Sequence, residues 1–316
     1  VTGGAGFIGG HLAEEFVHDG HDVVVLDTLE PFYDRGIKEH NIEAGESAAH
    51  DGDGTYEFIE GSVTDAAVVA DMVENVDVIF HQAAQAGVRA SWGKSFRIYT
   101  DNNVLATQRL LEAARRAEPR KVVYASSSSV YGEGRDRPTR EGDPKRPLSP
   151  YGVTKLACEH LCHLYEHNYG VPTLSLRYFT VYGPMGRPDM SVWRFAEAIL
   201  RGDQVVIYGD GTQSRGFTYV DDVVEANLLA AASRYTDRAF NVGGASSATV
   251  NELLAMIEEI LGREASIRYE PFAKGDARKT LADMTRSRRM LGLTVRTSLA
   301  EGLPPAIESI RQYYGL

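Results

Sequence analysis

Short, mostly apolar runs alternate with longer amphipathic segments along the first half of the chain. Five runs are typical of buried strands: residues 22–26, 56–60, 76–81, 121–125 and 172–177. Three segments place apolar residues at helical spacing: residues 7–18, 102–116 and 151–169. Strands and helices that alternate in this way predict βαβ units. The expected fold class is therefore α/β, with a doubly wound parallel sheet covered by helices on both faces.

The pattern is less regular after residue 177. The expected elements are a helix at 191–200, a strand at 204–208, a strand-to-helix unit at 217–232, a strand at 240–242, and a mostly helical stretch at 250–316 with one strand at 267–269. These elements predict one domain of residues 1–180, rejoined by residues 216–244. Residues 181–215 and 245–316 would form a smaller C-terminal lobe over a substrate at the carboxyl ends of the strands.

One polar segment interrupts the early alternation. Residues 28–54 contain one proline and four glycines, which favour turns and loops. We expect a loop there, with one short helix near residues 36–44.

Composition and charge narrow the functional classes. Thirty-three lysines and arginines against 44 aspartates and glutamates give a formal charge of −11, which argues against nucleic acid or an anionic membrane as a partner. Cys158 and Cys162 lie four residues apart in a helical pattern, so we interpret them as buried thiols rather than a metal site or disulfide framework. No membrane span or signal peptide is evident. We expect a cytoplasmic location, no metal, and a few residues before Val1, which lies inside a strand.

The first ten residues contain the strongest motif. They are predicted to form a strand end, a turn and a helix start, with glycines at positions 3, 6 and 9 that allow a tight turn and a close approach to a pyrophosphate. The N-terminus of the following helix is a natural anion site. Asp27 ends the next strand about 20 residues later, where a carboxylate would bond an adenosine ribose. An ordinary glycine turn is the alternative, but the strand and helix context favours dinucleotide binding.

A second motif, Tyr151-x-x-x-Lys155, lies on a predicted helix, where residues four apart share a face. A phenol is a weak base at neutral pH because its unperturbed pKa is about 10, and a nearby ammonium favours the phenolate. Such a pair is common by chance. Four serines, Ser126 to Ser129, strengthen the interpretation of Tyr151 and Lys155 as a functional pair. They follow a strand whose carboxyl end faces the ligand site of a doubly wound sheet.

Together these motifs resemble the extended short-chain dehydrogenase/reductases, specifically the branch of NAD-dependent nucleotide-sugar epimerases and dehydratases, which have a Rossmann-type sheet. The resemblance extends through most of the chain and is highly specific. The matching stretches are residues 2–9, 27, 81–84, 103–104, 126–132, 151–155, 177–184, 215–222 and 241–243.

The resemblance implies a role for each matching residue. The catalytic set would be Ser127, Tyr151 and Lys155. The NAD-binding set would be Gly3, Gly6, Phe7, Ile8, Asp27, Ser62, Val63, Gln82, Ala83, Ala84, Asn103 (preferred over Asn102), Ser126, Tyr151, Lys155, Tyr178 and Phe179. The substrate-binding set would be Arg89, Ser127, Ser128, Thr180, Arg187, Tyr208, Arg215 and Asp276.

Two details concern the cofactor. Asp27, as a free carboxylate, would repel a 2′-phosphate and so favour NAD over NADP. Ser62 departs from many relatives, which carry an aspartate there for the adenine amino group, so adenine contact through this side chain is in doubt.

The residues after Ser127 favour epimerisation. Relatives that dehydrate a dTDP-sugar carry an Asp-Glu pair there, and relatives that decarboxylate UDP-glucuronate carry a glutamate. Ser128 and Ser129 occupy these places. The implied reaction is C4 oxidation of a UDP-sugar, rotation of the 4-keto intermediate and return of the hydride. Dehydratase, decarboxylase and non-catalytic NAD-binding regulator remain alternatives.

Several loop residues bear on which sugar the UDP-sugar substrate carries. Residues 31–34, 38–39, 86–89 and 186–190 are similar to UDP-glucuronate 4-epimerases, and Thr180 replaces an asparagine that many UDP-galactose 4-epimerases carry. Arg187 would pair bidentately with a C6 carboxylate. UDP-glucuronate is slightly preferred, with UDP-glucose and UDP-galactose close behind. Relatives usually form homodimers through the two helices predicted here at 102–116 and 151–169.

Overall fold

Six parallel strands form the larger sheet of the computed structural model, which describes residues 1–244 and 246–316. In spatial order they are β2 (Thr55–Glu60), β1 (Asp22–Asp27), β3 (Val78–His81), β4 (Lys121–Ser127), β5 (Thr173–Tyr178) and β9 (Arg238–Val242). Thr2 joins β1 to β3 through single bridges to Leu26 and His81. The predicted parallel α/β sheet is confirmed, and the strand predicted at 240–242 rejoins it next to β5.

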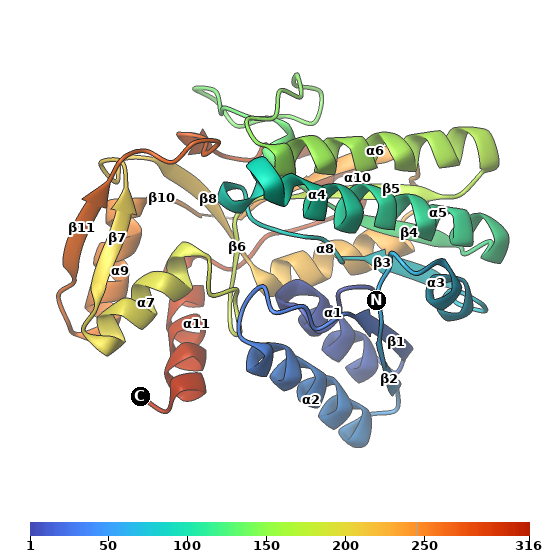
Figure 1. Cartoon of the computed structure of the whole chain (residues 1–316), viewed down its shortest axis with the longest axis horizontal. Coiled ribbons are helices and arrows are strands. Elements are labelled where there is room, and N and C mark those ends of the chain that lie inside the picture. The colour runs from blue at the N-terminus through green and yellow to red at the C-terminus, as the bar shows by residue number, and fades with distance from the viewer. Residues whose placement is uncertain (245) are drawn as a thin grey trace.

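Helices cover both faces of this sheet (Figure 1). One hydrophobic core contains residues of α1 (Phe7–His18) and α8 (Val220–Ala232), with α2 (Arg35–Asp51) packed on α1. The opposite core contains residues of α3 (Ala66–Met72), α5 (Ala106–Ala117) and α6 (Pro150–Tyr169). A short helix, α4 (Phe96–Tyr99), and a π-helical segment, Thr100–Leu105, lead into α5.

A second unit lies beside the carboxyl ends of the main strands (Figure 1). Its strands are β6 (Val181–Tyr182), β7 (Gln204–Tyr208), β8 (Ser214–Tyr219), β10 (Ser246–Thr249), β11 (Ser266–Glu270) and β12 (Lys279–Thr280). β8 pairs with β6, β10 and β12, and β7 pairs with β11. Helices α7 (Ser191–Arg201), α9 (Val250–Leu261) and α11 (Leu299–Tyr314) share a separate core with β6, β7, β8 and β10, while α10 (Thr285–Leu291) returns to the first unit.

The segment predicted to be a loop with one short helix near residues 36–44 contains a longer helix. Helix α2 extends over Arg35–Asp51, and Asp34 caps it by accepting a hydrogen bond from the Gly36 N–H at 2.9 Å. Gly45 does not mark a turn. A Cβ atom at this position would lie 2.3 Å from the Tyr56 ring, so the glycine lets α2 pack closely against β2. The helix predicted near residues 36–44 is present, but its length was underestimated because a glycine required by packing has the same sequence signature as a turn.

Other whole-chain predictions concern the cysteines and the membrane. Cys158 and Cys162 are free, buried thiols on α6, which confirms their interpretation. In the described ranges, the helices are all too short or too polar to cross a membrane. The same residues include no cluster of three side chains suited to a metal ion.

Candidate active site

A cavity of about 1130 Å³ lies where the carboxyl ends of the main strands meet the second unit. Its wall combines the N-terminal glycine turn, the ends of β1 to β5, and side chains of the second unit. This is the position at which a doubly wound sheet binds its ligands.

The glycine turn fits a pyrophosphate. Gly3 has φ +69°, and a Cβ there would lie 2.6 Å from the Ala83 N atom. A Cβ on Gly9 would lie 2.2 Å from the Gly3 carbonyl oxygen. Helix α1 starts at Phe7 without a side-chain cap, so its first N–H groups are open to an anion.

Asp27 is buried, and it is paired rather than free. Its Oδ1 accepts hydrogen bonds from the Leu29 N–H at 2.9 Å and from the Lys38 ammonium at 3.0 Å. The side chains of Lys38 and Asp27 are 9% and 7% exposed. The prediction of a free carboxylate at this site was therefore wrong, because Lys38 on α2 neutralises it. A bound ribose would face the Asp27–Lys38 ion pair, which has no net charge, and the second Asp27 carboxylate oxygen would be available to accept its hydrogen bond.

Sequence reasoning missed two cavity residues on this side, Lys38 and Tyr33. The Tyr33 hydroxyl lies 3.8 Å from the position a Cβ on Gly6 would take, so it stands over the glycine turn. Burial, reinforced by the Asp27 charge, raises the pKa of Tyr33, which keeps it a neutral hydrogen-bond donor. The stretch that contains both residues had been noticed as a resemblance, and the predicted short helix included Lys38, but its pairing with Asp27 was not predicted.

The predicted catalytic residues converge in one part of the cavity wall. Ser127 ends β4, and its Oγ accepts a hydrogen bond from the Ser129 N–H at 3.1 Å. Tyr151 lies in the first turn of α6, which Ser149 caps and Pro150 begins. Lys155 follows one turn later, 3% exposed, with its ammonium donating to the Ala125 carbonyl at 2.8 Å.

Close packing keeps this helix against the serines. A Cβ on Gly152 would lie 2.6 Å from the Ser129 carbonyl oxygen, so only glycine allows the first turn of α6 to approach this near. The Lys155 ammonium lies 6.0 Å from the centroid of the Tyr151 ring. The arrangement therefore presents a hydroxyl, a phenol and an ammonium to one ligand.

A buried ion pair fastens β4, β5 and α6 together behind this wall. Glu159 on α6 accepts the Ser126 Oγ–H at 2.5 Å and both Nε–H and Nη2–H of Arg177, at 2.8 and 2.7 Å. Arg177 also donates to the Tyr131 hydroxyl at 2.7 Å. Ser126 lines the cavity, but its hydroxyl is already used as a donor within the protein.

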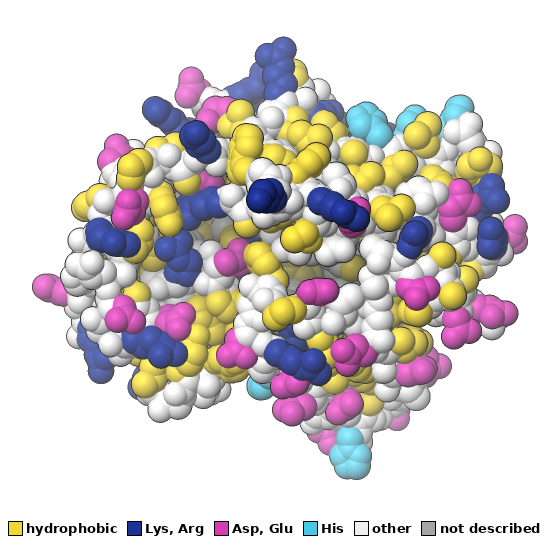
Figure 2. All heavy atoms as spheres, viewed as in Figure 1, with side chains coloured by type: hydrophobic (Ala, Val, Ile, Leu, Met, Phe, Trp, Pro, Cys, Tyr) yellow, Lys and Arg dark blue, Asp and Glu magenta, His cyan; other side chains and the backbone are white. Residues whose placement is uncertain are grey.

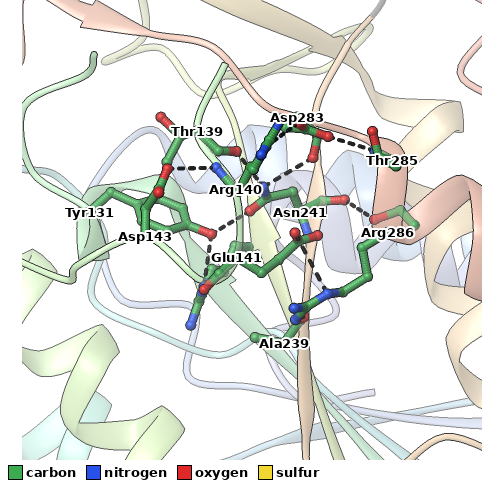
Figure 3. A network of polar contacts seen from close by, with 12 residues as sticks. Tyr131, Thr139, Arg140, Glu141, Asp143, Ala239, Asn241, Asp283, Thr285 and Arg286 are labelled. Carbon is green, nitrogen blue, oxygen red and sulfur yellow. Dashed lines mark hydrogen bonds and ion pairs between the residues drawn. The ribbon is translucent and has the colours of Figure 1, made fainter. Parts of the chain in front are cut away.

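A polar network extends from Tyr131 to the C-terminal part of the chain (Figure 3). The Tyr131 hydroxyl donates to Asn241 Oδ1 at 2.6 Å, and Asn241 Nδ2 donates to the Thr139 and Asp283 carbonyls at 2.8 and 3.2 Å. Glu141 accepts from the Asn241 N–H at 3.0 Å. Asn241, fully buried, thus braces the loop after the serines against the segment that follows β12.

All but one of the predicted cofactor residues line the cavity: Gly3, Gly6, Phe7, Ile8, Asp27, Ser62, Val63, Gln82, Ala83, Ala84, Ser126, Tyr151, Lys155, Tyr178 and Phe179. Asn103 is the exception. Its amide donates to Thr154 Oγ1 at 2.9 Å and accepts from the Gln85 N–H at 2.7 Å, and Asn102 lines the cavity instead. The structure therefore places Asn102 and not Asn103 on the cavity wall, within a π-helical segment that contains both residues. The preference for Asn103 as the cofactor contact stays a prediction.

All eight predicted substrate residues line the same cavity: Arg89, Ser127, Ser128, Thr180, Arg187, Tyr208, Arg215 and Asp276. Two of the three arginines are already paired. Arg89 lies 4.1 Å from the Tyr208 ring centroid and donates to Asp276 at 2.7 Å. Arg187 forms a bidentate pair with Asp189 at 2.9 and 2.6 Å.

Arg215 differs from these two. Its guanidinium donates to the Ser214 and Arg278 carbonyls at 2.9 and 3.3 Å. Burial lowers its pKa, and the charges of Asp276 and Glu133 oppose this only in part. A half-buried guanidinium bonded to neutral carbonyls is suited to a phosphate.

Comparisons with known proteins agree with this geometry. A sequence model described as the NAD dependent epimerase/dehydratase family matches residues 1–243. The chain is 40% identical to an uncharacterized UDP-glucose epimerase, YtcB, of Bacillus subtilis (strain 168), over 99% of this chain and 98% of the relative.

Two solved proteins are similar over 99% of this chain and 98% of their own. A UDP-glucuronic acid 4-epimerase from Bacillus cereus, in complex with UDP-glucuronic acid and NAD, is 37% identical with a TM-score of 0.93. MoeE5 in complex with UDP-glucuronic acid and NAD is 43% identical with a TM-score of 0.88, and its complex with UDP-glucose and NAD gives 42% and 0.87.

Proposed function

Since this chain belongs to the NAD-dependent epimerase/dehydratase family, we propose that it catalyses the NAD-dependent 4-epimerisation of a UDP-sugar. The observation that carries the proposal is the convergence of Ser127, Tyr151 and Lys155 in the cavity that also contains the glycine turn. The solved relatives bind NAD together with UDP-glucuronic acid or UDP-glucose.

The chemistry is a proton transfer beside a hydride transfer. NAD bound on the glycine turn supplies the hydride acceptor for the sugar C4 and the donor for its return. The Tyr151 phenolate oxygen takes the proton of the C4 hydroxyl, and the Ser127 hydroxyl donates a hydrogen bond to the same C4 oxygen. The Lys155 ammonium stabilises the phenolate, and its own place is fixed by the Ala125 carbonyl.

The carboxylates of the cavity argue against water loss or decarboxylation. Among the described residues, those that line it are Asp27, Glu30, Asp189 and Asp276. Three of these are ion-paired, Asp27 with Lys38, Asp189 with Arg187 and Asp276 with Arg89. Ser128 and Ser129 stand where a dehydratase or decarboxylase needs an acid, and neither hydroxyl is a proton donor of suitable strength near neutral pH.

The proposed substrate is UDP-glucuronate slightly ahead of UDP-glucose. Arg187 lines the cavity with Tyr151, and a planar guanidinium is suited to a carboxylate at C6. Arg215 would meet the diphosphate, while Tyr208 and Asp276 would meet the nucleoside.

The test is to incubate the purified protein with UDP-glucuronate and, separately, UDP-glucose, and to follow the anomeric protons by NMR. We expect a galacturonate signal from the first and a weaker galactose signal from the second. A 4-keto-6-deoxy or pentose product would instead identify a dehydratase or a decarboxylase. Cofactor binding with no turnover of any nucleotide sugar would favour the regulator.

We further propose a homodimer through α5 and α6. Val153 and Leu164 on α6 are each 50% exposed, and Leu105, at the end of the π-helical segment that leads into α5, is 38% exposed. Figure 2 shows hydrophobic side chains gathered over the same region. Substitution Leu164→Glu should halve the mass measured by light scattering, whereas Ile260→Glu, an exposed apolar position on α9, should not. A wild-type monomer would contradict the proposal.

Two free cysteines also suit the proposed cytoplasmic location.

A further inference from the structure

The Arg187–Asp189 pair is built into a short turn at the cavity wall. The two residues lie between β6 and α7, separated only by Pro188. Backbone hydrogen bonds from Gly186 to Gly183 and from Met190 to Arg187, at 3.2 and 3.1 Å, fix the turn without either side chain. The bidentate pairing of Arg187 with Asp189 is therefore a property of the loop itself.

This pair lies close to the proposed reaction centre. Both side chains line the cavity with Tyr151. The ring centroid of Tyr99 lies 6.3 Å from that of Tyr151. The charge of Arg187 lowers the pKa of Tyr99 and the charge of Asp189 raises it, so both charged groups are near this part of the wall. A group at C6 of a sugar whose C4 hydroxyl meets Tyr151 would be within reach of the pair.

The geometry leaves one edge of the guanidinium for a ligand. Asp189 takes Nε–H and Nη2–H, and no other hydrogen bond of Arg187 is found in the described part of the protein. The Nη1 group can therefore donate to a C6 substituent while Asp189 stays in place. A carboxylate at C6 would meet the attraction of Arg187 and the repulsion of Asp189 together. A neutral hydroxymethyl group could accept from Nη1–H and donate to the Asp189 carboxylate.

We propose that Asp189 is a specificity-determining residue that makes the C6 site charge-neutral, so that the enzyme accepts both a C6 carboxylate and a C6 hydroxymethyl group. This inference rests on the proposed function, because it assumes that the cavity binds a UDP-sugar. It differs from a role for Arg187 alone, which would select only the carboxylate. The solved relative that binds both UDP-glucuronic acid and UDP-glucose shows that one protein of this fold can hold both sugars.

The test compares Asp189→Asn with the wild type. Asparagine keeps the size of the side chain and an acceptor for Nε–H but removes the negative charge. We expect the ratio of kcat/KM for UDP-glucuronate to that for UDP-glucose to rise about tenfold or more, the change that about 1.4 kcal/mol makes. Asp203→Asn is the matched control, since it removes the same charge from an exposed position after α7 and should leave the ratio unchanged.

Binding measurements separate this inference from the proposed function. Dissociation constants of both UDP-sugars are measured by calorimetry with the NAD-loaded Tyr151→Phe variant, whose turnover should be at least about 10²-fold slower, with and without Asp189→Asn. A selective gain for UDP-glucuronate supports the inference even if the wild type epimerises neither sugar. An equal effect on both sugars, or weaker binding of UDP-glucuronate, would mean that Asp189 only orients Arg187. Failure of either sugar to bind would overturn the inference as well.

Discussion

Removal of the Arg177 guanidinium should be one of the most destabilising single changes in the sheet. Arg177→Met keeps most of the length of the side chain but leaves the Glu159 carboxylate without its cation. The side chains of Arg177 and Glu159 are 5% and 10% exposed, so water cannot replace the lost partner. The Tyr131 hydroxyl and the Glu141 carbonyl each lose a hydrogen bond as well.

The magnitude follows from the burial of the pair. Breaking a buried ion pair by removing one partner costs about 3–5 kcal/mol. A chain of 316 residues that unfolds as one unit has an unfolding entropy of about 0.66 kcal/mol/K, so the midpoint should fall by about 5–8 °C. Because Ser126 is bonded to Glu159 and precedes the catalytic Ser127, Ser127 should also lose order, and turnover should fall together with stability.

The assay is calorimetric and urea-induced unfolding of wild type and variants. Arg140→Met is the matched control, because Arg140 pairs with Asp283 at 2.9 Å but is 67% exposed, and its loss should cost less than about 1 kcal/mol. The double variant Arg177→Met/Glu159→Leu should recover at least half of the loss, since no buried charge remains. A cost below about 1 kcal/mol for Arg177→Met would refute the reasoning.

Three other predictions concern catalysis, the cofactor and pH. Tyr151→Phe should lower kcat by about 10²–10⁴-fold while UDP-sugar affinity stays within a factor of two or so, and near-normal turnover would contradict the role of the phenol. Gly9→Ala should purify without NAD, because its Cβ would meet the Gly3 carbonyl at 2.2 Å, whereas Gly142→Ala, with open space around it, should keep the cofactor. His81 is fully buried, and desolvation, with a smaller effect of Lys155, lowers its pKa to about 3. The unfolded chain therefore binds more protons than the folded protein between pH 6.5 and 3, so the free energy of unfolding rises with pH in that range. In the wild type this effect should cost about 1.4 kcal/mol when the pH falls from 7.5 to 5.5, and His81→Gln should abolish that part of the pH dependence. An unchanged pH dependence of urea unfolding in this variant would show that His81 has the same pKa in the folded and the unfolded protein.

Local sequence signals predicted the parts of the site that depend on backbone geometry. The glycine turn needs small residues at positions 3 and 9, and α6 needs Ser149 and Pro150 at its start, so both leave marks in the sequence. The same rules failed at α2, where Gly45 is required by the Tyr56 ring.

Pairings formed by folding were harder to predict. Lys38 reaches Asp27 only because α2 forms, and Asp189 occupies Arg187 only because the turn around Pro188 brings them together. Asn103 was preferred over Asn102 from the family resemblance, whereas the π-helical segment that contains both places Asn102 on the cavity wall. In each case the residue type can be read from the sequence, but what the side chain contacts or faces depends on the fold.

The central claim is that the sugar C4 is oxidised and reduced within this cavity with no loss of its own hydrogen. The most direct measurement is NMR of the reaction with UDP-glucuronate in deuterated water. The account predicts a C4-epimerised product with protium at C4 and no net consumption of NAD. Deuterium at C4, or a product that has lost water or carbon dioxide, would contradict it.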